Sequence, residues 1–372
     1  LRASMADSKT WGNSFSYFNQ SEDWNGKVYL DIMPEIYSNL AEVKKATTDP
    51  IPLAVAEILK VTAIVRVTDV YGPIPYSQVG QDGKLTAPFD TQKDVYTKMF
   101  QELSDAITTL TANRTNDFSP NADQVFGGKV EKWIKFANSL KLRMAIRIRY
   151  ADATLAEQMV KEAISTENGQ VGVMENNDDN AFMKVSLNPF YTIFGWGDSR
   201  IGADLLTYMN AYEDPRRSVY ALESTFTDSS ITNGYHGLRI GNTHTAVDAK
   251  MYSSMNVTAT APLMWMNAAE VTFLRAEGAL RGWAMGGEAQ ALYEKAVSLS
   301  FDERKASGAD AYVKDDEKVP ADYVDPMGEY SHDAVSTITI AWEPGAANFE
   351  KNLERIITQK WIAIFPLGVE AW

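Results

Sequence analysis

The sequence predicts an all-α protein built from tetratricopeptide-like helical hairpins, with a large irregular insertion that carries little strand. Apolar residues recur at three- and four-residue spacing in several long segments, as on one face of an α-helix. Two such segments, at about 266–283 and 289–300, are joined by Gly286 and Gly287 and carry small residues where an αα-hairpin makes close contact. Between residues 171 and 261 this period is lost, and short runs rich in Asn, Asp, Gly and aromatic residues replace it.

The N-terminal part predicts a loop followed by two helices. Residues 1–25 show no clear period and are expected to be mostly loop, whereas residues 26–45 show an apolar helical face. Asp49 followed by Pro50 is typical of a helix start, because the carboxylate caps free amides and proline is tolerated in the first turn. The helix that follows, to about Asp69, is apolar nearly all round and is therefore expected to be buried.

Two further helix starts are indicated by capping patterns. Thr91 with Asp94, and Thr154 with Glu157, place a hydroxyl three residues before a carboxylate, as a capping box does. Later in the chain, helices are expected at about 201–212 and 349–365. The repeats are too divergent to give a strict period, so the hairpin architecture rests on element order and on small contact residues.

The segment 127–150, GGKVEKWIKFANSLKLRMAIRIRY, predicts a long helix with an apolar stripe and many basic residues. The ordinary interpretation is a core helix whose basic face is solvated. The alternative is that its arginines pair with acidic neighbouring helices, since the whole chain carries a net charge of -14. Neither interpretation is catalytic.

Composition excludes several functional classes. A pI near 4.8 argues against nucleic-acid binding, which needs a basic surface. The chain has no cysteine and only three histidines, so thiol chemistry and a histidine-rich metal site are not expected. The sequence contains no run of about 18 apolar residues, so it predicts no membrane-spanning helix. No phosphate-binding loop, nucleophile elbow or zinc-binding helix motif is present, so we expect no catalytic residue, cofactor or metal.

Aromatic residues in polar loops are the best candidates for a binding site. A sugar presents flat C–H faces that an exposed aromatic ring can cover, and hydroxyls that Asp, Asn or Arg can bind. Trp196 fits best, because it lies between two glycines and is followed by Asp198 and Arg200. The remaining candidates are aromatic and lie in similar surroundings: Tyr191, Trp11, Trp24 and Trp342. The alternative for each tryptophan is that it packs between a loop and the helices.

Four motifs in order resemble those of SusD/RagB-type nutrient-binding outer-membrane lipoproteins. The turn at residues 69–76, DVYGPIPY, is similar to that family's YGDIPY turn. Residues 137–147, ANSLKLRMAIR, resemble its FANSLKLRLAMR helix, and residues 270–277, EVTFLRAE, resemble its AEVxFLxAEA helix. The end of the chain, from Thr358 to Trp372, resembles the TQKWIA…EAW signature of one SusD-like subgroup.

The resemblance implies a single SusD-like domain over residues 1–372, apparently truncated at both ends. In this interpretation residues 26–170 and 262–372 form the helical array, and residues 171–261 form an irregular insertion on the ligand side. The family's lipid-bearing N-terminal cysteine and signal peptide are absent, and the segment that normally follows the terminal EAW is missing. We therefore expect the chain to be a trimmed piece of a longer protein.

The resemblance also implies a function. It predicts a non-enzymatic, surface-exposed lipoprotein of the cell outer membrane that captures glycans for import through a partner SusC-like TonB-dependent transporter. Attachment would use an N-terminal lipid that this chain does not contain. The same fold binding peptides or other nutrients is the alternative, and an all-α glycosidase is a further one. The family motifs do not fix ligand-binding residues, so the candidate site rests on the aromatic residues alone.

Overall fold

The computed structural model describes residues 5–7, 21–80, 86–197 and 199–371. The chain divides into two compact units, one of residues 21–174 and one that combines residues 1–20 with residues 175–372. Helices dominate both of them, which confirms the predicted all-α class. The assignment of residues 1–372 to one domain stays a prediction.

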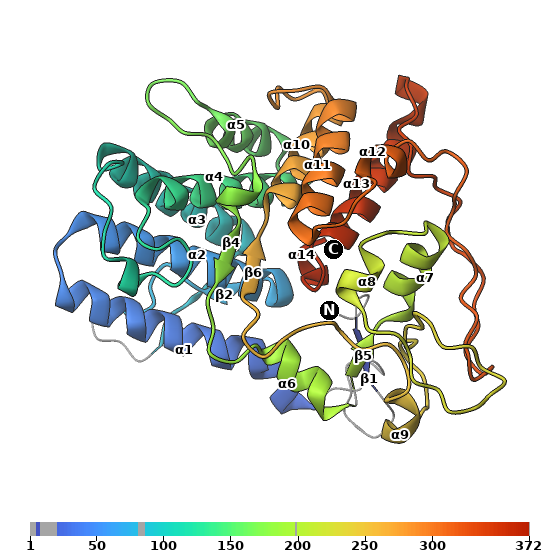
Figure 1. Cartoon of the computed structure of the whole chain (residues 1–372). Helices are drawn as coiled ribbons and strands as arrows, with labels where there is room; N and C mark the ends of the chain where they lie inside the picture. Colours follow the sequence, from blue (N-terminus) through green and yellow to red (C-terminus); the bar gives the residue numbers. More distant parts are fainter. Residues whose placement is uncertain (1–4, 8–20, 81–85, 198, 372) are drawn as a thin grey trace. The chain divides into compact units, whose positions relative to one another are not determined.

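The unit of residues 21–174 is a series of antiparallel helices (Figure 1). Each helix packs against the next one in the sequence, as expected for stacked hairpins. A short antiparallel pair, β2 and β3, lies between the second and third helices. The elements of this unit are α1 (Glu22–Ala46), α2 (Pro50–Tyr71), β2 (Ile74–Pro75), β3 (Phe89–Asp90), α3 (Gln92–Ala112), η3 (Pro120–Ala122), α4 (Val130–Arg147) and α5 (Ala153–Ile164).

Side-chain caps fix where these helices begin. Asp49 caps α2 through the amide of Ile51, and the Thr91 hydroxyl accepts from the amide of Asp94 at 3.2 Å, as predicted. The predicted start of α1 at about residue 26 was wrong. The helix begins at Glu22, four residues earlier, because Ser21 caps it there. The predicted capping pair Thr154 and Glu157 was also wrong. Asp152 accepts from the Leu155 amide at 3.1 Å and so begins α5.

The basic helix α4 is buried over most of its length, so a simple solvated basic face was the wrong interpretation. The side chain of Lys141 is 4% exposed, and its Nζ contacts Glu162 of α5 at 3.1 Å. Arg147 pairs with Asp69 of α2. The alternative, arginines that pair with acidic neighbouring helices, is therefore confirmed for Arg147, and Lys141 makes a similar pair.

The second unit is built around α10, α11 and α13 (Figure 1, orange to red). The helices α10 and α11 form the predicted hairpin, and α13 packs against both. Gly278 of α10 leaves room for the Met285 side chain of the α10–α11 loop, because a Cβ there would lie 2.7 Å from that side chain. The elements are η4 (Asn177–Asp179), α10 (Ala268–Leu280), α11 (Ala289–Arg304), α12 (Ala309–Tyr312), η5 (Ala346–Asn348), α13 (Phe349–Ala363) and α14 (Gly368–Ala371).

The rest of this unit is loop-rich, as the loss of helical period predicts, but it contains more short elements than expected. Two antiparallel strand pairs, β1 with β5 and β4 with β6, join distant segments of the chain. The helix predicted at 201–212 begins two residues later, because residues 199–201 form a strand. These elements are β1 (Met5–Asp7), β4 (Ala181–Met183), α6 (Pro189–Trp196), β5 (Ser199–Ile201), α7 (Ala203–Ala211), α8 (Arg217–Tyr220), α9 (Ala246–Ala249) and β6 (Leu263–Met266).

A fully buried ion pair lies at the start of α8. Arg216 and Asp214 are both 0% exposed as side chains, and the Arg216 Nη2 lies 2.6 Å from an Asp214 oxygen. The same guanidinium donates to Ser300 of α11 and Gln359 of α13. This network ties the loop-rich segment to the helical core of its own unit, because each nitrogen of the Arg216 guanidinium has an acceptor there.

Candidate ligand-binding site

The best sequence-predicted binding residue, Trp196, lies at the end of the short helix α6. The helix begins at Asn188, whose side chain accepts from the Phe190 amide at 2.8 Å, and Pro189 occupies its first turn. The Asn188 amide group also donates to the Ala261 carbonyl at 2.8 Å. The helix ends at Gly197, whose φ of 91° favours glycine. Both ends of α6 are therefore fixed by local chemistry.

The side chains of α6 divide into one anchor and an exposed aromatic surface. Phe194 is 5% exposed and is the buried anchor. Trp196 is 63% exposed and Tyr191 is 47% exposed, and Leu187 just before the helix is 55% exposed. We call Tyr191 and Trp196 the α6 aromatic surface. Large apolar groups kept in water lose the stabilisation that burial would give, so their exposure points to a binding role.

Lys250 is a candidate that sequence reasoning missed. A Cβ on Gly197 would lie 2.3 Å from Cε of Lys250, so this lysine side chain passes directly over the end of α6. The ammonium of lysine offers three hydrogen-bond donors, which suits hydroxyl or carboxylate oxygens. Lys250 lies 54 residues after Trp196 in the chain, so no local sequence signal could link the two.

The polar residues predicted next to Trp196 have different surroundings. Arg200 is 6% exposed, and its guanidinium donates to the carbonyls of Ser199, Lys250 and Tyr252 at 2.7, 3.0 and 3.1 Å. It therefore holds β5 against the segment that contains Lys250, rather than extending into solvent. Asp198 lies outside the described residues.

The other predicted tryptophans have separate outcomes. Trp24 lies in the first turn of α1, in the other unit, and is 41% exposed. Trp342 is half-buried and its ring packs against Tyr293 of α11, with centroids 5.6 Å apart. Trp11 lies outside the described residues. The packing alternative therefore fits Trp342, and the α6 aromatic surface is the better candidate for ligand contact.

The described residues contain neither a metal-binding cluster nor a membrane-spanning helix. No group of three or more His, Asp or Glu side chains is placed to hold a metal ion within the described ranges. In the same residues, no helix is both long enough and apolar enough to cross a bilayer.

Comparison with known proteins assigns the family. The family described as SusD-like, "Susd and RagB outer membrane lipoprotein", matches residues 2–372. The chain belongs to the SusD-like family. This confirms the family resemblance inferred from the four motifs. It also confirms, at the level of the family, the predicted placement as an outer-membrane lipoprotein. The subgroup with the terminal TQKWIA…EAW signature stays a prediction.

Solved SusD homologues share the fold closely. One from Bacteroides thetaiotaomicron is 43% identical with a TM-score of 0.93, covering 100% of this chain and 77% of the homologue. One from Bacteroides uniformis is 43% identical with a TM-score of 0.92, and the match covers 100% of this chain and 78% of that homologue. A chitin-binding SusD homologue from Flavobacterium johnsoniae is 37% identical with a TM-score of 0.92, and the match covers 100% of this chain and 78% of that homologue. None of the curated proteins matches the chain.

Proposed function

We propose that this SusD-like protein is a non-enzymatic cell-surface protein that captures glycans. In the proposal, a partner SusC-like TonB-dependent transporter then imports the captured oligosaccharides or polysaccharides. The observation that carries the proposal is the α6 aromatic surface, where Tyr191 and Trp196 are held exposed on a helix fixed at both ends.

The geometry of α6 suits binding of a flat, hydroxyl-rich ligand. An exposed indole covers the C–H face of a sugar ring by dispersion contact, and neighbouring donors such as Lys250 can bind hydroxyls. Because the helix is already ordered, little conformational entropy is lost when a ligand docks. The chitin-binding activity of the homologue from Flavobacterium johnsoniae supports a glycan as the ligand class.

The absence of catalysis is part of the proposal and has its own support. Glycoside hydrolysis uses two carboxyl groups on either side of the scissile bond. The buried Asp214 is committed to Arg216, and the buried Asp325 accepts from the amides of Glu329 and Tyr330. These carboxylates hold the fold of the unit that carries α6, which leaves them poorly suited to proton transfer with a substrate.

Isothermal titration with a panel of oligosaccharides and polysaccharides, including chitin oligosaccharides, tests the ligand class. We expect saturable binding to at least one glycan, and a loss of about tenfold or more in affinity for Trp196→Ala, which is about 1.4 kcal/mol. Tyr150→Ala is the matched control, because Tyr150 is a 75% exposed ring on another part of the chain. Its affinity should equal that of the wild type.

Three results would contradict this proposal. Binding that Trp196→Ala leaves unchanged would place the site away from α6. Binding of a peptide pool with no response to any glycan would support the peptide alternative. Release of reducing sugar during incubation would identify an enzyme. The transporter part is tested separately by purifying the protein from native outer membranes and asking whether a TonB-dependent transporter accompanies it.

A further inference from the structure

A small pocket lies in the same unit as α6 but is lined by other segments. Its walls are α7, residues 235–237 and residues 321–324, and its volume is about 200 Å³. Pockets for drug-sized ligands measure roughly 300–1,000 Å³. This pocket is therefore large enough for one small ring and too small for an extended chain.

Hydrogen bonds between the walls preform the pocket. The Tyr323 hydroxyl donates to the Gly237 carbonyl at 2.9 Å, and the Asn210 side chain donates to the Tyr235 carbonyl at 2.8 Å. A Cβ on Gly237 would lie 2.6 Å from the Ala203 Cα, so only glycine allows this wall to approach α7. Burial, followed by the charge of Asp325, raises the pKa of Tyr323, which keeps its hydroxyl a donor.

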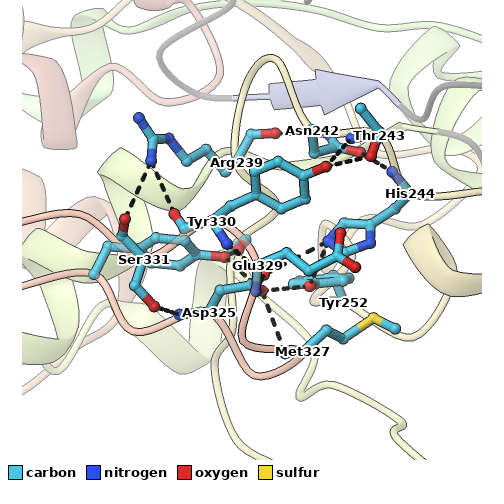
Figure 2. A network of polar contacts seen from close by, with 12 residues as sticks. Arg239, Asn242, Thr243, His244, Tyr252, Asp325, Met327, Glu329, Tyr330 and Ser331 are labelled. Carbon is cyan, nitrogen blue, oxygen red and sulfur yellow. Dashed lines mark hydrogen bonds and ion pairs between the residues drawn. The ribbon is translucent and has the colours of Figure 1, made fainter.

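Figure 2 shows a polar network around the buried Asp325, which directly follows the 321–324 wall in the chain. Asp325, next to this wall, accepts from the Tyr252 hydroxyl at 2.5 Å and from the amides of Glu329 and Tyr330 at 3.1 Å. Arg239 donates to the Tyr330 carbonyl at 2.9 Å. Figure 2 shows Asp325 at the centre of these contacts, with Tyr330 extending toward Thr243. These hydrogen bonds connect the residue that follows the wall to Tyr252 and to residues 329–330.

The lining offers an aromatic ring and several acceptors. The guanidinium of Arg217 lies 4.7 Å from the Tyr235 ring centroid and supports that ring. One Asp322 oxygen accepts from the Ala334 amide at 2.8 Å, and among the described residues the other oxygen has no hydrogen-bond or ion-pair partner. The His236 Nε2 lies 3.0 Å from the Thr232 carbonyl, so Nε2 carries the proton and Nδ1 is the acceptor in the neutral ring.

These groups favour a neutral ligand with several hydroxyls. An anion would be repelled by Asp322, whose second oxygen can accept from a ligand hydroxyl. A ring with hydroxyls can contact Tyr235 through its C–H face and donate to Asp322 and His236. We propose that this pocket binds a single neutral pyranose unit, a terminal or branching sugar of the glycan. This inference rests on the proposed glycan-capture function.

The test is saturation-transfer NMR on the whole protein with four monosaccharides: glucose, galactose, mannose and N-acetylglucosamine. We expect saturable binding of at least one. Ala321→Trp places an indole at the pocket wall and should weaken that binding about tenfold or more. Asp322→Asn keeps an oxygen for the Ala334 amide but replaces the second acceptor, and should weaken it as well. Val335→Trp, at a 79% exposed position of the following segment, is the control and should bind as the wild type does.

The outcomes separate this inference from the proposed function. If polysaccharides bind to the wild type and no monosaccharide does, the pocket inference is wrong and glycan capture stands. Monosaccharide binding that Ala321→Trp leaves intact would also overturn it. Binding of arginine methyl ester in place of sugars, lost in Asp322→Asn, would show that the pocket takes a cation. If no glycan of any size binds, both proposals fail together.

Discussion

The helices α4 and α6 place their side chains in opposite ways. On α4, the charged Lys141 is buried and pairs with Glu162, and Arg143 is also buried. On α6, the aromatic Tyr191 and Trp196 are exposed. Charged residues are usually outside and large aromatic residues are usually at least partly inside, so each helix departs from the general rule.

The difference follows from what packs against each helix. The neighbouring helices α3 and α5 both pack against α4, so its basic side chains find partners inside the fold, such as Ser104 and Glu162. On the short α6 the Phe194 ring is buried, whereas the Tyr191 and Trp196 rings face solvent. Buried charge on α4 is therefore explained by structure, whereas the exposed rings of α6 have no packing role and stay candidates for ligand contact.

The largest effect is expected where a buried cation is removed from its partner. Arg216→Met leaves the carboxylate of Asp214 buried without its counter-ion, and breaking a buried pair in this way costs about 3–5 kcal/mol. Urea unfolding followed by circular dichroism measures this loss. The double variant Arg216→Met with Asp214→Leu removes both charges and should recover part of the stability.

An Arg216→Met protein as stable as the wild type would break the comparison, because the buried cation would then contribute nothing to the fold. A double variant less stable than Arg216→Met would mean that the lost packing, and not the unpaired carboxylate, causes the effect.

A smaller effect, with a defined pH dependence, is expected at Lys141. Burial lowers the pKa of Lys141, and the hydrogen bond to Glu162 only partly opposes this. The unfolded chain therefore binds more protons than the folded protein between the lowered pKa and the ordinary value of 10.5, so this residue makes stability rise with pH across that window. The pair adds little at neutral pH, since Glu162 is 41% exposed.

The variant Lys141→Met removes this titration and keeps a side chain of similar length. The free energy of unfolding of the wild type minus that of the variant should rise from neutral pH towards pH 10.5. Other titrating groups are shared and cancel in this difference. A difference that is flat or falls with pH would show that burial does not lower the pKa of Lys141.

Much of the helical fold could be predicted from the sequence, because local chemistry decides it. The caps at Asp49 and Thr91 and the glycine turn at residues 286–287 act over a few residues and could be read directly. The helix α6 was missed, because an aromatic run of eight residues shows no helical period. Asn188 followed by Pro189 was the available signal, since it is a cap and a first-turn proline.

The site could be predicted less well, because long-range contacts decide it. The exposure of Trp196 was anticipated from its glycine neighbours, but the burial of Arg200 depends on carbonyls of residues 250 and 252. The proximity of Lys250 to Gly197 depends on the same segment. Burial of Lys141 likewise requires two neighbouring helices, and nothing in its own helix indicates it. Contacts between residues far apart in the sequence, such as these, can be identified only in the folded chain.

The smallest effect on stability is expected at the α6 aromatic surface. Measuring it tests most directly whether the exposed rings of α6, unlike the buried charges of α4, contribute nothing to the fold. Trp196→Ala and Tyr191→Ala should change the free energy of unfolding by less than about 0.5 kcal/mol, because exposed side chains lose little packing. Phe194→Ala on the same helix is the internal control, and loss of this buried ring should cost about 3–5 kcal/mol. Urea unfolding measures all three. If Trp196→Ala costs as much as Phe194→Ala, then Trp196 is a packing residue like Trp342, and weakened glycan binding by that variant would no longer locate the site.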